Sequence, residues 1–511
     1  MRDANKSILI VGGGTAGWLC AAYLAKALAL LDNPHLTITL LESPEIGTIG
    51  VGEGTFPTIR ETLRFLEIDE RKFIRESSAT FKQGILFTDW LHEPLPGKRH
   101  QFFHPFEAPF YSEETSLVPY WLLQEAKTRP SFAEAVTIQN RVAGAKRGPK
   151  RLGEPDFDGP LNYAYHIDAR SLARLLAERA LELGVAHLSG EVEHTELGYD
   201  GAIDNIVLTD GSKLCADLFV DCSGFRAELI GRGLDSPFRS ARDCLFVDRA
   251  AACRVPYGDP EAPIESYTLA NAHEGGWTWD IGLAGGRGIG CVYSSDHIGD
   301  DRALSILRDY VGAGFDEAKA RILSFDVGYR EQQWVRNCVA VGLSAGFLEP
   351  LEATGLVLIE AAVGMIAELF PHHGPIDAPA RRFNHLMAAR FENIVKFLKL
   401  HYCLSRRSER FWRENADPST IPEELQELLS QWRYRPPGRF DFILDVESFA
   451  FFNYQYILYG MEFQTDLSAG RSDFPNVAAA QRVFDRVRAF GEKAARDLPS
   501  HRELVSELAA A

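Results

Sequence analysis

Residues 7–22 read SILIVGGGTAGWLCAA, and this stretch decides the fold. The apolar residues Ile8–Val11 predict a short buried strand, and the apolar run 18–31 predicts the helix that follows it. Between them, the spacing G-x-G-x-x-G is set by Gly12, Gly14 and Gly17. The first glycine permits a tight turn, the second lets a pyrophosphate approach the backbone, and the third lets the helix pack against the strand. The stretch predicts an α/β domain that binds an adenine dinucleotide.

A second strand follows at residues 36–41 and ends at Glu42, whose carboxylate can accept a hydrogen bond from a ribose hydroxyl. An ordinary glycine turn is the alternative reading, but the strand, helix and second strand around this turn favour the cofactor. A glycine-dense loop at 45–55 also predicts a functional segment, because ordering glycines costs entropy. The expected cofactor-binding residues are Gly12, Gly14, Thr15, Ala16, Gly17, Glu42, Gly50, Val51, Gly52 and Gly342.

Composition limits the function classes. The chain has 511 residues and a formal net charge of −17, which argues against nucleic acid or an anionic membrane as partner. Eight cysteines stand singly, without a C-x-x-C pair, which is typical of a reducing cytoplasm and not of a disulfide framework. Nothing before Ile8 resembles a signal peptide, and no metal-ligand spacing is present in the sequence. We expect a cytoplasmic protein without a metal.

The middle of the chain predicts a second sheet. Residues 166–183 favour a helix with Asp168 as N-cap, whereas alternation over 245–294 favours antiparallel strands. Trp277 and Trp279 are two apart, so their side chains share one strand face. The pair at 285–286 predicts a hairpin and not a second dinucleotide turn, so no nicotinamide-binding domain is expected.

The expected organisation has two parts. The first is a cofactor-binding module over residues 1–375, with substrate-side sheet inserted at about 91–160 and 240–325. The second is a mainly helical substrate-binding subdomain over 376–511.

Five motifs together resemble the flavin-dependent halogenases of the tryptophan halogenase family. They are GGGTAGW at 12–18, IGVGEGT at 49–55, TFKQG at 80–84, WTWDI at 277–281 and EPLEATG at 349–355. The resemblance covers nearly the whole chain in the same order. Gly282 stands where the family signature has proline, and Ala353 where serine is usual. The resemblance implies a Rossmann-type FAD-binding domain of the flavin monooxygenase kind, with an inserted antiparallel sheet and a helical C-terminal subdomain.

The family also implies roles for particular residues. Lys82 would hold hypohalous acid, by a hydrogen bond or as a haloamine, and Glu352 would accept the proton lost from the arene. Glu349 is a rival for the second role, and Thr354 could be only a helix cap. Halide would bind at Thr354 and Gly355. The substrate and its passage would be lined by Trp277, Trp279, Phe103, His104, Pro105, Phe106, Phe452 and Tyr454.

The implied cofactors are FAD, used as FADH2, together with O2 and chloride or bromide. A separate NADH-dependent flavin reductase would supply the reduced flavin, and a homodimer is compatible with the family. An aromatic hydroxylase is the main alternative, but the Gly-Asp motif of those enzymes is replaced here by Gly342-Leu343-Ser344. A flavin-binding module without enzymatic activity would not need the lysine and glutamate motifs. Because residues 449–461 contain no charged side chain, we expect a neutral indole to be preferred over free tryptophan.

Overall fold

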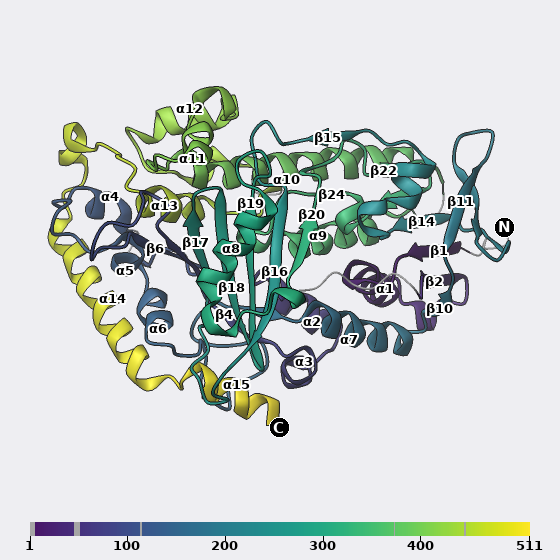
Figure 1. Cartoon of the computed structure of the whole chain (residues 1–511), viewed down its shortest axis with the longest axis horizontal. Helices are drawn as coiled ribbons and strands as arrows, with labels where there is room; N and C mark the ends of the chain where they lie inside the picture. The colour runs from purple at the N-terminus through teal and green to yellow at the C-terminus, as the bar shows by residue number, and fades with distance from the viewer. Residues whose placement is uncertain (1–5, 45–51, 113–114, 372–373, 444–445, 511) are drawn as a thin grey trace. The chain divides into compact units, whose positions relative to one another are not determined.

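The chain folds into two compact units. The computed structural model describes residues 6–44, 52–112, 115–371, 374–443 and 446–510. The first unit comprises residues 1–78, 167–242 and 325–392, and the second comprises 79–166, 243–324 and 393–511. Each unit is therefore assembled from three separate stretches of sequence, and the strands and helices of both are labelled in Figure 1.

Six strands of the first unit form one sheet around β1 (Lys6–Val11). This strand pairs in parallel with β2 (Leu36–Glu42) on one side and with β14 (Leu218–Asp221) on the other. The sheet is completed by β10 (Ala186–Ser189), β23 (Cys338–Ala340) and β22 (Trp334–Val335), of which only β22 runs antiparallel to its neighbour. A parallel sheet is covered on both faces, which explains the unbroken apolar run in β1.

Helices pack on this sheet. Helix α1 (Thr15–Ala27) contacts α7 (Ala169–Glu182) and α9 (Thr354–Leu369), and Figure 1 shows α1 beside β1 and β2. The remaining helices of the unit include α2 (Ile59–Phe65) and α3 (Glu70–Ser77). Two smaller sheets are formed by β11 (Val192–Leu197), β12 (Ile203–Leu208) and β13 (Lys213–Leu214), and by β15 (Phe238–Ser240), β21 (Gly328–Arg330) and β24 (Gly346–Phe347).

The bounds of α1 differ from the apolar run that predicted it. The helix begins at Thr15 and ends at Ala27, not at residues 18 and 31. It starts earlier because Gly14 in an extended conformation is its N-cap, a position that carries no apolar signal. It ends earlier because Ala29 adopts a left-handed conformation with φ 50°, after which Leu30–Asp32 form a separate 3₁₀ turn.

The second unit is built on a seven-stranded mixed sheet. Its order is β20 (Arg321–Ser324), β16 (Arg249–Pro256), β19 (Gly286–Tyr293), β18 (Gly276–Leu283), β17 (Thr268–His273), β5 (Gly84–Thr88) and β6 (Gln101–Pro105). All neighbours are antiparallel except β17 and β5. The expected hairpin joins β18 to β19, and its register pairs Leu283 with Gly286.

A short ladder beside this sheet carries the TFKQG motif. Strand β4 (Thr80–Lys82) pairs antiparallel with β9 (Ala164–Ile167), and Thr80 lies opposite His166. His166 was expected to begin a helix, but it belongs to this strand. Helix α7 begins only at Ala169, after Asp168 has accepted a hydrogen bond from the backbone N–H of Ser171 at 2.9 Å. The prediction of Asp168 as N-cap is confirmed.

The C-terminal third is mainly helical. Helix α10 (Asp377–Cys403) contains the boundary between the two units. The helices that follow in the second unit are α11 (Arg410–Asn415), α12 (Glu423–Trp432), α13 (Phe451–Gly460), α14 (Val477–Asp497) and α15 (His501–Ala510). Three earlier helices also belong to this unit, α4 (Leu117–Leu122), α5 (Phe132–Val136) and α6 (Gln139–Gly144), and α8 (Asp300–Val311) packs on β19. The expected fold class is confirmed.

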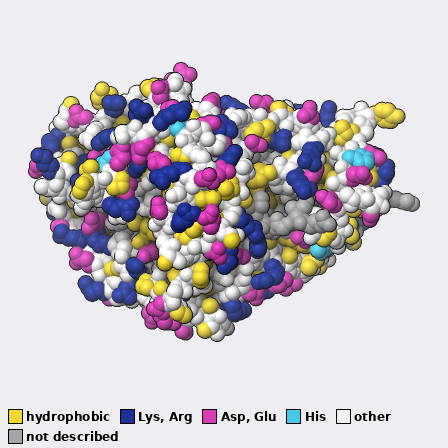
Figure 2. Space-filling view, viewed as in Figure 1, with side chains coloured by type: hydrophobic (Ala, Val, Ile, Leu, Met, Phe, Trp, Pro, Cys, Tyr) yellow, Lys and Arg dark blue, Asp and Glu magenta, His cyan; other side chains and the backbone are white. Residues whose placement is uncertain are grey.

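The surface is of mixed charge. On the face drawn in Figure 2, basic and acidic side chains are interspersed over the residues shown in colour. In the described part of the chain, no helix is long and apolar enough to cross a membrane.

Asp221 stabilises the first unit at the end of β14. Its buried carboxylate accepts hydrogen bonds from the backbone N–H groups of Ser223, Leu229 and Ile230 at 3.0, 2.9 and 2.8 Å. We expect Asp221→Ala to lower the free energy of unfolding by about 2 kcal/mol or more, because buried donors lose their acceptor. Denaturant unfolding measures this. Asp210→Ala, which removes an exposed carboxylate from a turn, is the matched control, and an equal loss in both variants would contradict the account.

Candidate active site

The glycine turn of the first unit has two closed positions and one open position. Gly12 has φ 120°, and a Cβ there would lie 2.2 Å from the carbonyl oxygen of Cys222. A Cβ on Gly17 would lie 1.8 Å from the carbonyl oxygen of Gly12. Nothing lies within 4 Å of the Cβ that Gly14 would carry, at the N-terminus of α1. Gly12 and Gly17 therefore serve close backbone packing, whereas the empty space at Gly14 could accommodate a bound pyrophosphate.

Thr15, Ala16 and Gly342 lie together beside this turn. Gly342 has φ 76°, and a Cβ there would lie 2.8 Å from the Cβ of Ala16. The hydroxyl of Thr15 donates to the carbonyl of Ala169 at 3.3 Å. The segment that follows β23 therefore lies against the N-terminus of α1, at the place where we expect the cofactor to bind.

Glu42 also reaches the glycine turn. A Cβ on Gly13 would lie 2.1 Å from the carboxyl carbon of Glu42, so the carboxylate lies directly against this backbone. Its Oε2 atom is 3.2 Å from Nε2 of His187, and the side chain of Glu42 is 35% exposed. It retains surface for a ribose hydroxyl. His187, whose ring lies 5.2 Å from Trp18 edge-on, was not predicted from the sequence.

The glycine-dense loop is described only from Gly52 onward, and Gly50 and Val51 lie outside the described residues. Gly52 is buried with φ 96°. Strand β3 (Glu53–Gly54) contacts the 3₁₀ turn at Leu351–Ala353. Burial, and secondarily the charge of Asp168, raises the pKa of Glu53 to about 7. Glu53 was not among the site residues expected from the sequence, although an acid between two glycines of this loop was a signal for it.

Glu352 lies in a strained turn before α9. Glu352 and Ala353 adopt left-handed conformations with φ 63° and 56°, which cost about 1 to 3 kcal/mol each for residues other than glycine. Glu352 is 4% exposed and Glu349 is 1% exposed, so burial does not decide between these two candidate bases. Such strain persists only where the surrounding structure enforces it, and it is concentrated at functional sites.

Thr354 and Gly355 lie in the first turn of α9. The N-cap is Ala353, so Thr354 is not the capping residue and no side chain caps the helix. The first N–H groups of a helix have no partner within it and carry partial positive charge. Nothing lies within 4 Å of a Cβ on Gly355. This helix start fits a small anion such as halide.

Lys82 belongs to the second unit, whereas Glu352 belongs to the first. Lys82 lies on β4, and its side chain is 1% exposed. Its Nζ atom is 5.3 Å from the centre of the Phe106 ring. The backbone N–H of Phe106 donates to the carbonyl of Gln83, next to Lys82, at 3.2 Å. The expected lysine and the expected aromatic wall are therefore adjacent.

The rest of that wall is strand β6. Its register pairs Phe103 with Leu86, His104 with Ile85 and Pro105 with Gly84. His104 is 4% exposed, and its Nε2 atom lies 2.9 Å from Oδ1 of Asn453 on α13.

Trp277 and Trp279 lie on one face of β18, with ring centres 6.4 Å apart and exposures of 2% and 6%. Trp279 fits because its neighbour across the ladder is Gly290, where a Cβ would lie 2.1 Å from the indole ring. Trp277 lies 6.2 Å from Trp90. The two indoles are therefore fixed by packing within the sheet.

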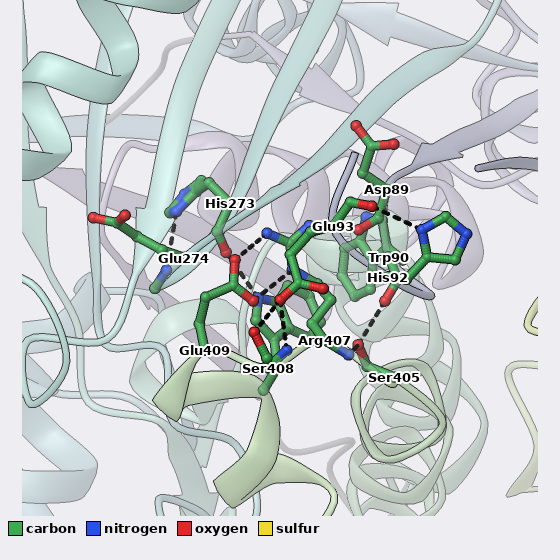
Figure 3. Close-up of polar contacts among 12 residues, drawn as sticks. Asp89, Trp90, His92, Glu93, His273, Glu274, Ser405, Arg407, Ser408 and Glu409 are labelled. Atoms are coloured by element: carbon green, nitrogen blue, oxygen red, sulfur yellow. Dashed lines mark hydrogen bonds and ion pairs between the residues drawn. The ribbon is translucent and has the colours of Figure 1, made fainter. Parts of the chain in front are cut away.

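A polar network holds the segment around Trp90, as Figure 3 shows. Arg407 donates to the carbonyl of Asp89 at 2.7 Å and forms an ion pair with Glu409. The hydroxyl of Ser405 donates to the carbonyl of Trp90 at 2.6 Å. Because Arg407 and Ser405 are far in sequence from Asp89 and Trp90, the sequence did not predict this support for the segment of Trp90.

The two expected substrate residues on α13 differ in their surroundings. Tyr454 is 1% exposed, with Phe442 at 4.4 Å and Phe397 at 4.8 Å between ring centres, so it is part of an aromatic core. Phe452 is half-buried against Phe451. The first charged residue after the aromatic run, Glu462, is paired with Arg406 at 3.4 Å.

The expected site residues that the structure describes line neither a metal-binding cluster nor the cleft beside helix α15. In the described ranges, no group of three or more His, Cys, Asp or Glu side chains could hold a metal ion. A cleft of about 780 Å³ lies between segments 145–147 and 261–264 and helix α15, and none of the expected site residues lines it.

Known proteins resemble this chain over nearly its full length. The family model for tryptophan halogenase matches residues 7–473. A tryptophan 6-halogenase from Streptomyces toxytricini is 33% identical over an alignment that covers 98% of each chain.

Solved structures agree with these matches. A tryptophan halogenase from Shewanella frigidimarina superposes with a TM-score of 0.93 at 38% identity, covering 100% of this chain and 98% of the other. A flavin-dependent halogenase from Brevundimonas superposes with a TM-score of 0.87 at 31% identity, covering 99% and 100%. The chain belongs to the tryptophan halogenase family of flavin-dependent enzymes.

Proposed function

We propose that this enzyme uses FADH2 and O2 to install bromide or chloride on an electron-rich aromatic, an indole, through hypohalous acid held by Lys82. The observation that carries the proposal is the setting of Lys82, which is buried with its Nζ atom 5.3 Å from the centre of the Phe106 ring, directly after β6. A surface lysine would be solvated, and its three donors would bind water. A lysine buried at an aromatic wall can instead present a small polar oxidant to an apolar substrate.

The first unit would hold the cofactor. Gly12, Gly14 and Gly17 would accommodate the pyrophosphate, Glu42 the ribose, and Thr15, Ala16 and Gly342 the adjoining part of the flavin. Reduced FAD, when bound, supplies with O2 the oxidising power that converts halide into hypohalous acid. The protein holds the reactants and excludes water. The N–H groups at Thr354 and Gly355 would hold halide.

Lys82 and Glu352 would act in the later steps. Lys82 donates a hydrogen bond to the oxygen of hypohalous acid and so polarises the halogen toward the arene carbon. The arene gains the halogen, and the resulting cation must lose its ring proton. Glu352 stabilises that charge and accepts the ring proton. The hydroxide left by the halogen takes a proton from Lys82 and departs as water, and exchange with solvent then returns a proton to Lys82 and removes one from Glu352. The turn at Glu352 and Ala353, whose backbone is in the left-handed conformation, holds the carboxylate of Glu352 in place.

The alternative, an aromatic hydroxylase, is not favoured. Its aspartate motif is absent from the turn at Gly342–Ser344, where Ser344 instead donates to the carbonyl of Asp221.

A separate NADH-dependent flavin reductase is proposed as the source of reduced flavin. The glycine pair that might suggest a second dinucleotide site, Gly285 and Gly286, lies in the hairpin between β18 and β19. It does not lead from a strand into a helix.

Among indoles, we propose that neutral ones are preferred over free tryptophan. An ammonium and a carboxylate need partners once they leave water. On α13, Tyr454 is packed in the core, and beyond the helix Glu462 is engaged by Arg406. Neither residue supports a clamp for a zwitterion.

The flavin site is tested with Gly14→Val. We expect this variant to fold and to lose FAD binding, because the added side chain enters the open space meant for the pyrophosphate. Gly17→Val should fail to fold, because its side chain would meet the carbonyl of Gly12. Flavin fluorescence titration and thermal unfolding measure these outcomes. Gly258→Val, at an exposed open position, is the control, and wild-type flavin affinity in Gly14→Val would show that the assignment is wrong.

Two variants distinguish the formation of hypohalous acid from the transfer of its halogen to the substrate. Lys82→Ala should consume reduced flavin and O2 but yield no halogenated product, because the lysine acts after hypohalous acid forms. Glu352→Gln should slow product formation by about 10²-fold or more. For each variant, chromatography measures the halogenated product, and this amount is compared with the amount of reduced flavin that is oxidised. Full halogenation by the Lys82 variant would remove this residue from the mechanism.

Substrate choice is tested by competition between equal amounts of indole and tryptophan. We expect indole to be halogenated faster, at C3, its most nucleophilic carbon. Mass spectrometry and NMR of the products measure rate and position. Clean halogenation of the benzo ring of tryptophan that outpaces indole would contradict the absence of a clamp.

A further inference from the structure

The strand that carries Lys82 is only three residues long, so its position depends on what holds its edges. Strand β9 pairs with one edge of β4. On the other side, the backbone N–H of Phe81, the residue before Lys82, donates to Nε2 of His501 at 2.9 Å. His501 is the first residue of α15, and it is fully buried. A C-terminal side chain thus contacts the backbone next to Lys82.

The imidazole of His501 is held in one tautomer. Because Nε2 accepts from Phe81, Nδ1 carries the proton, and it donates to the carbonyl of Ile264 at 3.0 Å. Burial lowers the pKa of His501 to about 4, against the opposing effect of the Ile264 carbonyl and with a smaller contribution from Arg502. The ring is neutral at physiological pH and makes both hydrogen bonds.

The backbone of His501 is fixed as well. Its N–H donates to the carbonyl of Lys146 at 2.9 Å, and the adjacent Ser500 forms a β-bridge with Arg147. The ring of Phe81 lies 6.0 Å from the imidazole. The side chain therefore has little freedom to follow a displaced strand, and it constrains β4 instead.

The neighbouring residues of the motif are bound to other segments. The hydroxyl of Thr80 donates to the carbonyl of Gly282 at 2.5 Å. The backbone N–H of Gln83 donates to the carbonyl of Ser266 at 2.6 Å, and its side chain donates to the hydroxyl of Ser266 at 2.9 Å. Of these anchors, His501 is the one that joins the C-terminal helix to the strand.

We propose that His501 is a positioning residue that fixes the backbone at Phe81 and so sets where Lys82 presents the halogen. The inference rests on the proposed role of Lys82. The side chain of Lys82 is buried and has little room to change rotamer, so the position of its Nζ atom depends on where its Cα is held. A shift of about 1 Å at a reacting group can cost about 10² in rate. Helix α15 is thereby part of the apparatus for halogen transfer, although His501 touches no reactant.

The test compares three variants of the full-length enzyme. His501→Phe keeps a ring of similar shape but removes both hydrogen bonds, whereas His501→Gln keeps one acceptor and one donor. Leu504→Ala is the matched control, because Leu504 is a fully buried residue of α15 that does not bond to β4. For each variant, halogenated indole is measured per reduced flavin consumed, together with the release of hypohalous acid to a trapping reagent, the KM for indole and the Tm.

We expect His501→Phe to lower product per flavin about tenfold or more, with more oxidant escaping to the trap, and His501→Gln to restore part of the loss. Leu504→Ala should lower the Tm without changing product per flavin. The inference is wrong if His501→Phe has the wild-type ratio, or if Leu504→Ala loses as much as His501→Phe at equal Tm. If His501→Phe does not fold, His501→Asn replaces it, because the shorter amide of asparagine cannot reach both hydrogen-bond partners. In that case, equal product per flavin in His501→Asn and His501→Gln would overturn the proposal.

A parallel Lys82→Ala measurement separates the two hypotheses. If Lys82→Ala retains halogenation, the proposed role of the lysine fails. If it is inactive while His501→Phe behaves as wild type, only the positioning role fails.

Discussion

The first unit depends on one close approach, between the carbonyl of Gly12 and the backbone of Gly17. A Cβ at Gly17 would lie 1.8 Å from that oxygen, so only glycine allows α1 to pack this near to β1. The contact directs the helix N-terminus toward the open space at Gly14. Gly342 also approaches α1, since a Cβ there would lie 2.8 Å from the Cβ of Ala16, and this brings the end of β23 to the same place. The absence of side chains at these points creates the cofactor cradle.

The second unit meets a different demand, because it must bury the ammonium of Lys82. The residues on both sides of Lys82 are hydrogen-bonded to separate segments, which fixes the backbone that carries the lysine. The indoles of β18 are fixed by packing and by the network around Arg407. The chemistry proposed for the enzyme divides accordingly. Cofactor and halide contacts come from the first unit, and the lysine and aromatic contacts come from the second.

Local patterns predicted the fold well where the physics is local. The glycine spacing identified β1, α1 and their turn. Alternation over 245–294 identified antiparallel strands, and the glycine pair at 285–286 identified the hairpin of β18 and β19. The start of α1 was misplaced because a glycine N-cap leaves no apolar signal, and His166 was placed in a helix because β9 is only four residues long. His501 and Arg407 could not be found, because their partners, Phe81 and Asp89, lie more than 300 residues away in sequence. Long-range hydrogen bonds leave no periodic trace.

In the proposed reaction, the oxidising power of O2, made available by reduced flavin, is delivered to an arene as halogen and not as oxygen. This reaction is tested most directly by supplying the full-length enzyme with a flavin reductase, FAD, NADH, bromide and indole, and identifying the product by mass spectrometry. We expect the product to be an indole that carries the isotope pattern of bromine and that forms only when bromide is present. An indole that has gained oxygen instead, with bromide in excess, would contradict the proposed reaction.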